Sequence, residues 1–156
     1  MERFNGIPAH PLFVHGPVVL VPLAVLVTLV LVARPGWRQR FGPAQAGLAV
    51  VSLIATFLAV RSGEAFYRLI ENDIDATQHK NLALNTRWLV LAFTIGTLIY
   101  VGLDRRPRPD SAQRGSTAAW AVAGLTAVVG VVATVWMYKT GDAGAQLVWK
   151  GFLPNN

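Results

Sequence analysis

The segment from Leu12 to Ala33 constrains this chain most, because its 22 residues include one histidine and no charged side chain. An α-helix rises 1.5 Å per residue, so a helical segment of this length crosses about 30 Å of hydrocarbon. Lipid offers no hydrogen bonds to the backbone, so a spanning segment of this kind has to be helical. The segment therefore predicts a transmembrane helix near the N-terminus.

Three further apolar segments follow, and 53% of the 156 residues are hydrophobic against 14% charged, which is unusual for a soluble domain. We expect an all-α, integral membrane four-helix bundle that forms a single domain over residues 1–156. The expected helices cover residues 11–34, 44–67, 76–103 and 117–139, and residues 140–156 form a short outer segment. Pro17 and Pro22 each remove a backbone donor inside the first helix, so we expect that helix to be kinked in its first half.

Small residues recur every four positions on two of these helices, and they predict close packing against a neighbouring backbone. The two sets are Ala55, Ala59 and Gly63, and Ala119, Ala123 and Ala127.

Two short basic segments, residues 34–43 and 104–115, carry the prolines and glycines expected of loops between helices. Basic residues are equally numerous on the two sides of the expected bundle, but they are densest in these two segments. Because dense basic loops favour the cytoplasm, we place both segments there and both termini outside. The expected location is a bacterial inner (plasma) membrane, crossed several times.

Composition and motifs exclude several classes of protein. The chain has no cysteine, so it has no disulfides, thiolate-bound metals, iron–sulfur clusters or covalently attached c-type haem. The net charge of +6 lies in short loops beside apolar segments, which indicates membrane topology and no binding of nucleic acid. No nucleophile with an adjacent base, phosphate loop or zinc-protease helix is present, so we do not expect an enzyme.

The three histidines are the candidate site residues. An ionisable group inside a membrane is costly and is a functional candidate by default, and His15 lies within the first apolar segment. Its neutral imidazole could ligate haem iron or a divalent metal, or pass a proton. The alternative is a structural histidine that bonds to a carbonyl freed by the prolines of the same helix.

His10 lies five residues before His15, which separates the two by about 140° around a helix and about 7.5 Å along it. One straight helix therefore does not bring both to one ion, and His10 is expected to be an interfacial cap. His79 could supply a second ligand to a metal or haem opposite His15, since bundles build cofactor sites from facing helices. A solvated surface histidine is the alternative.

Two carboxylates are expected at the same end of the bundle as the histidines. Glu64 could orient a histidine ring as an acceptor, although an ion-pair ladder with Arg61 and Arg68 explains it equally. Asp142 is expected near the start of the outer segment, where it could cap a short turn.

Several motifs resemble a known family in the right order along the chain. They are His10-Pro11-Leu12-Phe13-Val14-His15-Gly16-Pro17, Ser62-Gly63-Glu64, His79, Thr140-Gly141-Asp142-Ala143-Gly144-Ala145 and Val148-Trp149. Together they resemble the bacterial four-helix membrane family catalogued as domain of unknown function 2231, over nearly the whole chain. Relatives are fused to redox modules such as Rieske or cytochrome domains, so the resemblance implies a b-type haem or an electron-transfer neighbour. Relatives commonly carry Gly-His where this chain has Gly141-Asp142, which leaves His10, His15 and His79 as the ligands available here.

The leading hypothesis is therefore a small membrane protein that binds haem b between His15 and His79 and takes part in membrane electron transfer. The alternative is a cofactor-free accessory or structural subunit, whose small-residue faces pack against a larger complex. A third hypothesis is an ion or proton pathway. The expected partners are the lipid bilayer and either further copies of the chain or a larger, respiratory-type membrane complex.

Overall fold

The computed structural model describes residues 3–4, 7–8, 10–70, 72, 74–105 and 117–149. Two short strands, β1 (Arg3–Phe4) and β2 (Ile7–Pro8), pair antiparallel before the first helix. The helices are α1 (His10–Phe13), α2 (His15–Ala33), α3 (Pro35–Ile70), α4 (Thr77–Asp104) and α5 (Thr117–Trp149). Since α1 and α2 form one span, the bundle has four spans, as the sequence predicts.

The first span, His10–Ala33, is bent by 18°, which confirms the expected kink. A single turn residue, Val14, separates α1 from α2. Pro17 lies in the first turn of α2, where a missing donor costs little, and Pro22 lies inside that helix.

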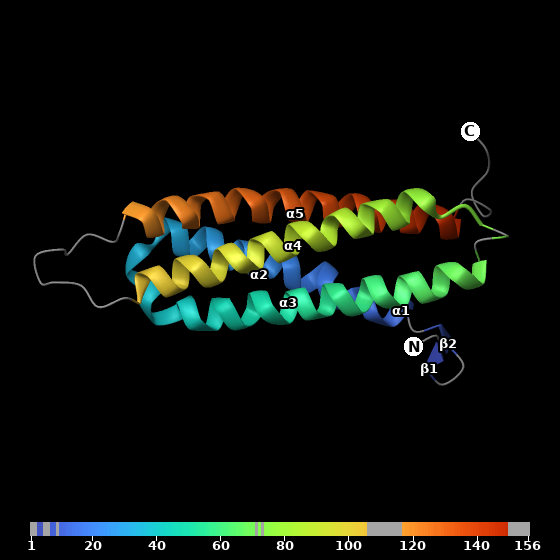
Figure 1. Ribbon diagram of the computed structural model, residues 1–156, viewed down its shortest axis with the longest axis horizontal. Coiled ribbons are helices and arrows are strands. Elements are labelled where there is room, and N and C mark those ends of the chain that lie inside the picture. The colour runs from blue at the N-terminus through green and yellow to red at the C-terminus, as the bar shows by residue number, and fades with distance from the viewer. Residues whose placement is uncertain are drawn as a thin grey trace, which may run out of the picture.

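The four spans form a ring in which each packs against its neighbours in sequence and α5 closes on α2. Figure 1 shows the helices running along the long axis of the molecule. At one end α1 and α4 begin while α3 and α5 finish. The termini of these four elements therefore create a shared rim, which holds the candidate site.

The bundle is apolar outside, and many of the residues buried inside it are small or hydroxylated. Outward-facing leucines and valines are exposed, among them Leu26, Leu125 and Val128, whereas Ala24, Ala123 and several threonines are buried. Exposing so much apolar surface to water is unfavourable by about 25 cal/mol per Å², but it costs nothing in lipid. The arrangement is therefore that of a membrane protein.

Both predicted sets of small residues lie at helix contacts. Ala119 and Ala123 are fully buried and Ala127 almost so. A Cβ placed on Gly16 of α2 would lie 3.4 Å from the Cβ of Ala55 on α3, so the first span passes close to α3. These contacts confirm the packing role of the small residues.

Two expected boundaries are wrong. Residues 35–43, expected in a loop, are the start of α3, because Pro35 occupies the first helical position, where proline is favoured. The outer segment begins as helix, since α5 continues through Gly141 to Trp149. Residues 106–116, expected in the second basic loop, and residues 150–156 lie outside the described residues.

Uncharged stretches locate the hydrocarbon band. Residues 41–60 of α3 carry no charge between Arg40 and Arg61, and at 1.5 Å per residue they span about 30 Å. On α4 the uncharged stretch runs from Arg87 to Asp104. Guanidinium contacts with the rings of Phe57 and Trp88, at 5.5 and 5.0 Å, hold Arg87 at one boundary.

Candidate functional site

Two histidines from different spans meet at the rim where α1 and α4 begin. The ring centroids of His10 and His79 are 6.0 Å apart and their planes are inclined by 74°. Both side chains are half-buried. His79 lies eight residues before Arg87, which places it about 12 Å beyond the hydrocarbon boundary on α4. We call these two residues the histidine pair.

His10 is held by α3. Its Nδ1 lies 3.2 Å from the carbonyl oxygen of Ala59 and 3.3 Å from Ser62 Oγ. A Cβ on Gly63 would lie only 2.9 Å from His10 Cε1, so the absence of a side chain makes room for the ring. Phe66 stacks on the imidazole with a centroid distance of 6.3 Å. The ring is therefore fixed by a hydrogen bond on one side and by packing on the other.

His79 is held by α5 in the same way. Its Nδ1 lies 2.8 Å from the carbonyl oxygen of Thr140, and a Cβ on Gly144 would lie 3.0 Å from its Cε1. The Thr140 hydroxyl donates to the Trp136 carbonyl at 2.8 Å and lies 3.0 Å from the buried hydroxyl of Thr86. These bonds tie the start of α4 to α5.

The two contacts share one local geometry. In each, the histidine meets the carbonyl of a residue whose i+4 neighbour is a glycine, Ala59 with Gly63 and Thr140 with Gly144. In a helix that carbonyl also accepts from the i+4 amide, and a Cβ on Gly63 or Gly144 would lie within about 3 Å of the approaching ring. The glycines therefore create the two docking positions.

The hydrogen bonds also fix which ring nitrogen carries the proton. A carbonyl oxygen only accepts, so Nδ1 must be the donor in both histidines. In a neutral imidazole the other nitrogen, Nε2, then holds a free lone pair. Donation from Nδ1 to a carbonyl is also the usual outer contact of a metal-binding histidine. The pair can thus offer two Nε2 ligands.

Gly63 and Gly144 each leave a space, here called a cradle, that one imidazole ring occupies. A side chain that fills either cradle should displace the ring. In Gly63→Ala and Gly144→Ala the new Cβ would meet the imidazole at about 3 Å, and we expect a loss of about 1–3 kcal/mol in stability. Nitrogen NMR of the imidazoles should report loss of the fixed Nδ1–H form. Gly141→Ala is the matched control, because apart from the adjoining backbone of α5 nothing lies within 4 Å of a Cβ there. An unchanged NMR spectrum in Gly63→Ala and Gly144→Ala would contradict the cradle geometry.

His15 is not an interior group. It is exposed, and its Nδ1 bonds at 2.7 Å to the carbonyl of Pro11 on its own span. The helical angle separates His10 from His15 as expected, but His10 is the one that faces the bundle. The first segment is apolar all round, so its sequence alone does not reveal which face is buried.

The two expected carboxylates do not bond to the histidines. Asp142 is exposed and accepts a hydrogen bond of 2.8 Å from Gln146 on the same helix, and Glu64 is half-buried on α3. Over the described residues, no group of three or more histidines, cysteines or carboxylates is placed to hold a metal ion. The acceptors that orient the rings are backbone carbonyls.

A repeated motif marks the two docking helices. Arg61-Ser62-Gly63-Glu64-Ala65 and Lys139-Thr140-Gly141-Asp142-Ala143 share the pattern basic, hydroxyl, glycine, acidic, alanine. The first copy lies near the end of α3, which follows the span that begins at His10. The second copy lies near the end of α5, which follows the span that has His79 in its first turn. Relative to the motif, the Thr140 carbonyl that binds His79 lies three residues further along α5 than the Ala59 carbonyl that binds His10 lies along α3. This repeat is the sequence signal that could have indicated Ser62 and Thr140.

Comparisons with known proteins identify the family. No curated protein and no solved structure matches the chain. A family model does match, over residues 6–153, and its description is Predicted membrane protein (DUF2231). That range includes all four spans, both copies of the repeated motif and the histidine pair, and it agrees with the resemblance seen in the sequence motifs. The chain is therefore a member of the DUF2231 family of membrane proteins.

Proposed function

We propose that the histidine pair binds a transition-metal centre, most simply the iron of haem b, and that the protein serves membrane electron transfer. The number of ligands supports haem. Haem would need only one or two ligands from the protein, because the porphyrin supplies four, whereas structural zinc usually needs four protein ligands. Two imidazoles meet at this rim, and the described residues provide no third ligand beside them.

The spacing of the rings carries the proposal. Imidazoles bind transition metals at a metal–nitrogen distance of about 2.0–2.1 Å, so two rings that would share one metal need centres within about 6 Å of each other. The observed centroid distance is 6.0 Å. The ligands in this proposal are His10 and His79, replacing the combination of His15 and His79 expected from the sequence.

The role of the surrounding residues follows from their contacts. The carbonyls of Ala59 and Thr140 hold the rings through Nδ1, while Gly63 and Gly144 allow the close approach. Bound haem would supply one-electron chemistry. His79 lies beyond the hydrocarbon boundary and His10 docks at that boundary on α3, on the outer side if the basic end of the bundle faces the cytoplasm. A redox partner in a larger, respiratory-type complex or a second copy of the chain could approach the histidine pair there.

An absorption spectrum tests this proposal. We expect protein purified in mild detergent with added haem to show a Soret band and a sharp reduced α band. Loss of one ligand in His10→Ala or His79→Ala should weaken haem binding by about 100-fold or more, since loss of an outer-shell partner alone costs about 10- to 100-fold. His15→Ala should keep the bands, because His15 is exposed and bonds only within its own span. Bands that persist in both His10→Ala and His79→Ala would refute the assignment.

A cofactor-free accessory subunit is the second candidate. It is favoured by the hydrogen bonds through which His10 and His79 already hold α1 to α3 and α4 to α5. In that case wild-type protein would show no visible bands after haem is added. His10→Gln and His79→Gln would then lower thermal stability, and the protein would copurify with a larger membrane complex.

A further inference from the structure

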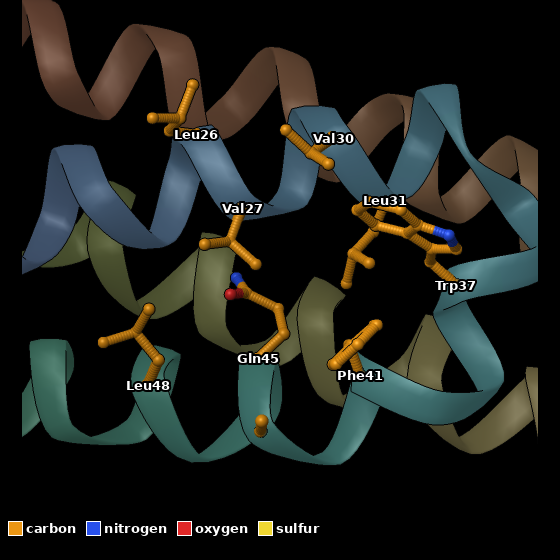
Figure 2. A pocket seen from close by; sticks show the side chains of 9 residues that line it. Leu26, Val27, Val30, Leu31, Trp37, Phe41, Gln45 and Leu48 are labelled. Carbon is orange, nitrogen blue, oxygen red and sulfur yellow. The ribbon is translucent and has the colours of Figure 1, made fainter.

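A groove on the lipid-facing side lies far from the histidine pair, between α2 and α3 near the residues that join them. Its volume is about 390 Å³, within the range of roughly 300–1,000 Å³ typical of ligand sites. The lining is almost wholly apolar, as Figure 2 shows. The principal lining side chains are Leu26, Val27, Val30, Trp37, Phe41 and Leu48.

The groove lies within the membrane and runs along the helices. From Phe41 to Leu48 it follows α3 for about 10 Å, at 1.5 Å per residue. Leu26 and Trp37 at its edges are 58% and 50% exposed, so the groove opens outward to lipid. Its direction and chemistry match an extended hydrocarbon chain that lies parallel to the spans.

Two arginines lie at the aromatic end of the groove. The guanidinium of Arg34 lies 5.9 Å from the ring centroid of Trp37, and that of Arg40 lies 5.4 Å from that of Phe41. Both arginines are exposed, and within the described ranges neither forms an ion pair with a carboxylate. Arg38, in the same turn, is buried and is neutralised by Asp104 at 3.0 Å. Uncompensated positive charge therefore remains at the mouth of the groove.

We propose that this groove binds an anionic phospholipid. One acyl chain occupies the apolar groove, and the phosphate group lies between Arg34 and Arg40. Guanidinium groups bind phosphate oxygens through paired hydrogen bonds, and basic pockets beside membrane helices attract anionic headgroups. Trp37 and Phe41 lie at the junction between chain and headgroup, where aromatic side chains are favoured.

Native mass spectrometry in detergent tests the headgroup. We expect wild-type protein to retain phosphatidylglycerol in preference to phosphatidylcholine with the same acyl chains. Each arginine near a membrane surface contributes about 1 kcal/mol, so Arg34→Gln with Arg40→Gln should weaken phosphatidylglycerol binding about 30-fold. The control is Arg61→Gln with Arg68→Gln, two exposed arginines near the other end of α3. Equal loss in both double variants, or an unchanged preference in the first, would overturn the proposal.

A second variant tests the groove itself. Ala44 lines it, so Ala44→Trp should fill the space and abolish lipid retention. Leu98→Trp places the same ring on an exposed position of α4 and should leave retention unchanged. Retention in Ala44→Trp would show that the acyl chain lies elsewhere. His10→Ala should bind lipid normally, so this result is independent of the outcome at the histidine pair.

Discussion

Replacing Asp104 with alanine is expected to lower the free energy of unfolding by about 3–5 kcal/mol, the largest effect we expect from a single substitution. Arg38 Nε lies 3.0 Å from Asp104 Oδ2, and the two side chains are only 3% and 6% exposed. The guanidinium also lies over the ring of Trp120 at 4.3 Å. Without its carboxylate, the arginine would remain as an uncompensated charge in a site closed to water.

The double replacement separates charge from packing. Arg38→Met with Asp104→Leu removes both charges and fills similar volumes, so we expect most of the lost stability to return. Denaturant titration in detergent, followed by circular dichroism, measures each step. Arg40→Ala is the matched control, because Arg40 is exposed and should change stability by less than about 0.5 kcal/mol. If the double variant is as unstable as Asp104→Ala, the stability lost in Asp104→Ala comes from altered packing and not from the unpaired charge.

Gly130 and Gly124 on α5 should respond to the same substitution with opposite signs. A Cβ on Gly130 would lie 2.9 Å from the Phe93 ring and from a methyl group of Val25. Gly130→Ala should therefore push three spans apart and cost about 1–3 kcal/mol. Apart from the adjoining backbone of α5, nothing lies within 4 Å of a Cβ on Gly124. Gly124→Ala should add about 0.5–1 kcal/mol, since alanine is the better helix former.

Thermal unfolding of the two variants in the same detergent provides the comparison. A melting temperature lowered by Gly130→Ala and raised by Gly124→Ala would locate the tightest approach of α2, α4 and α5 at Gly130. If both substitutions raise the melting temperature, the Phe93 ring can move away from Gly130 without loss of stability. The packing at Gly130 would then be looser than described.

The spans could be predicted from sequence because the membrane imposes their length and apolar character. The beginning of α3 was not predicted, since Gly36 and Pro43 lie within it and both residue types are signals that end helices in water. The end of α5 was missed for a related reason. Gly141 resembles a helix cap, but α5 continues through it to Trp149, and His79 bonds to the carbonyl of Thr140 beside it.

The site was predictable in part. The sequence indicates which residue types bear chemistry and which end of the bundle gathers them, and His79 does lie in the pair. The choice between His10 and His15 depends on the rotation of the first span. That rotation is decided by the cradle at Gly63 and by the carbonyl of Ala59, 49 residues from His10. No local pattern around either histidine contains this information.

The histidine pair is assembled from two similar hairpins, each with its own histidine, carbonyl and glycine. The two hairpins belong to one chain, joined by a tether of six residues between α3 and α4. A short tether converts association into an intramolecular step with an effective concentration in the millimolar range. The two imidazoles therefore meet in every folded molecule, however sparsely the protein is distributed in its membrane.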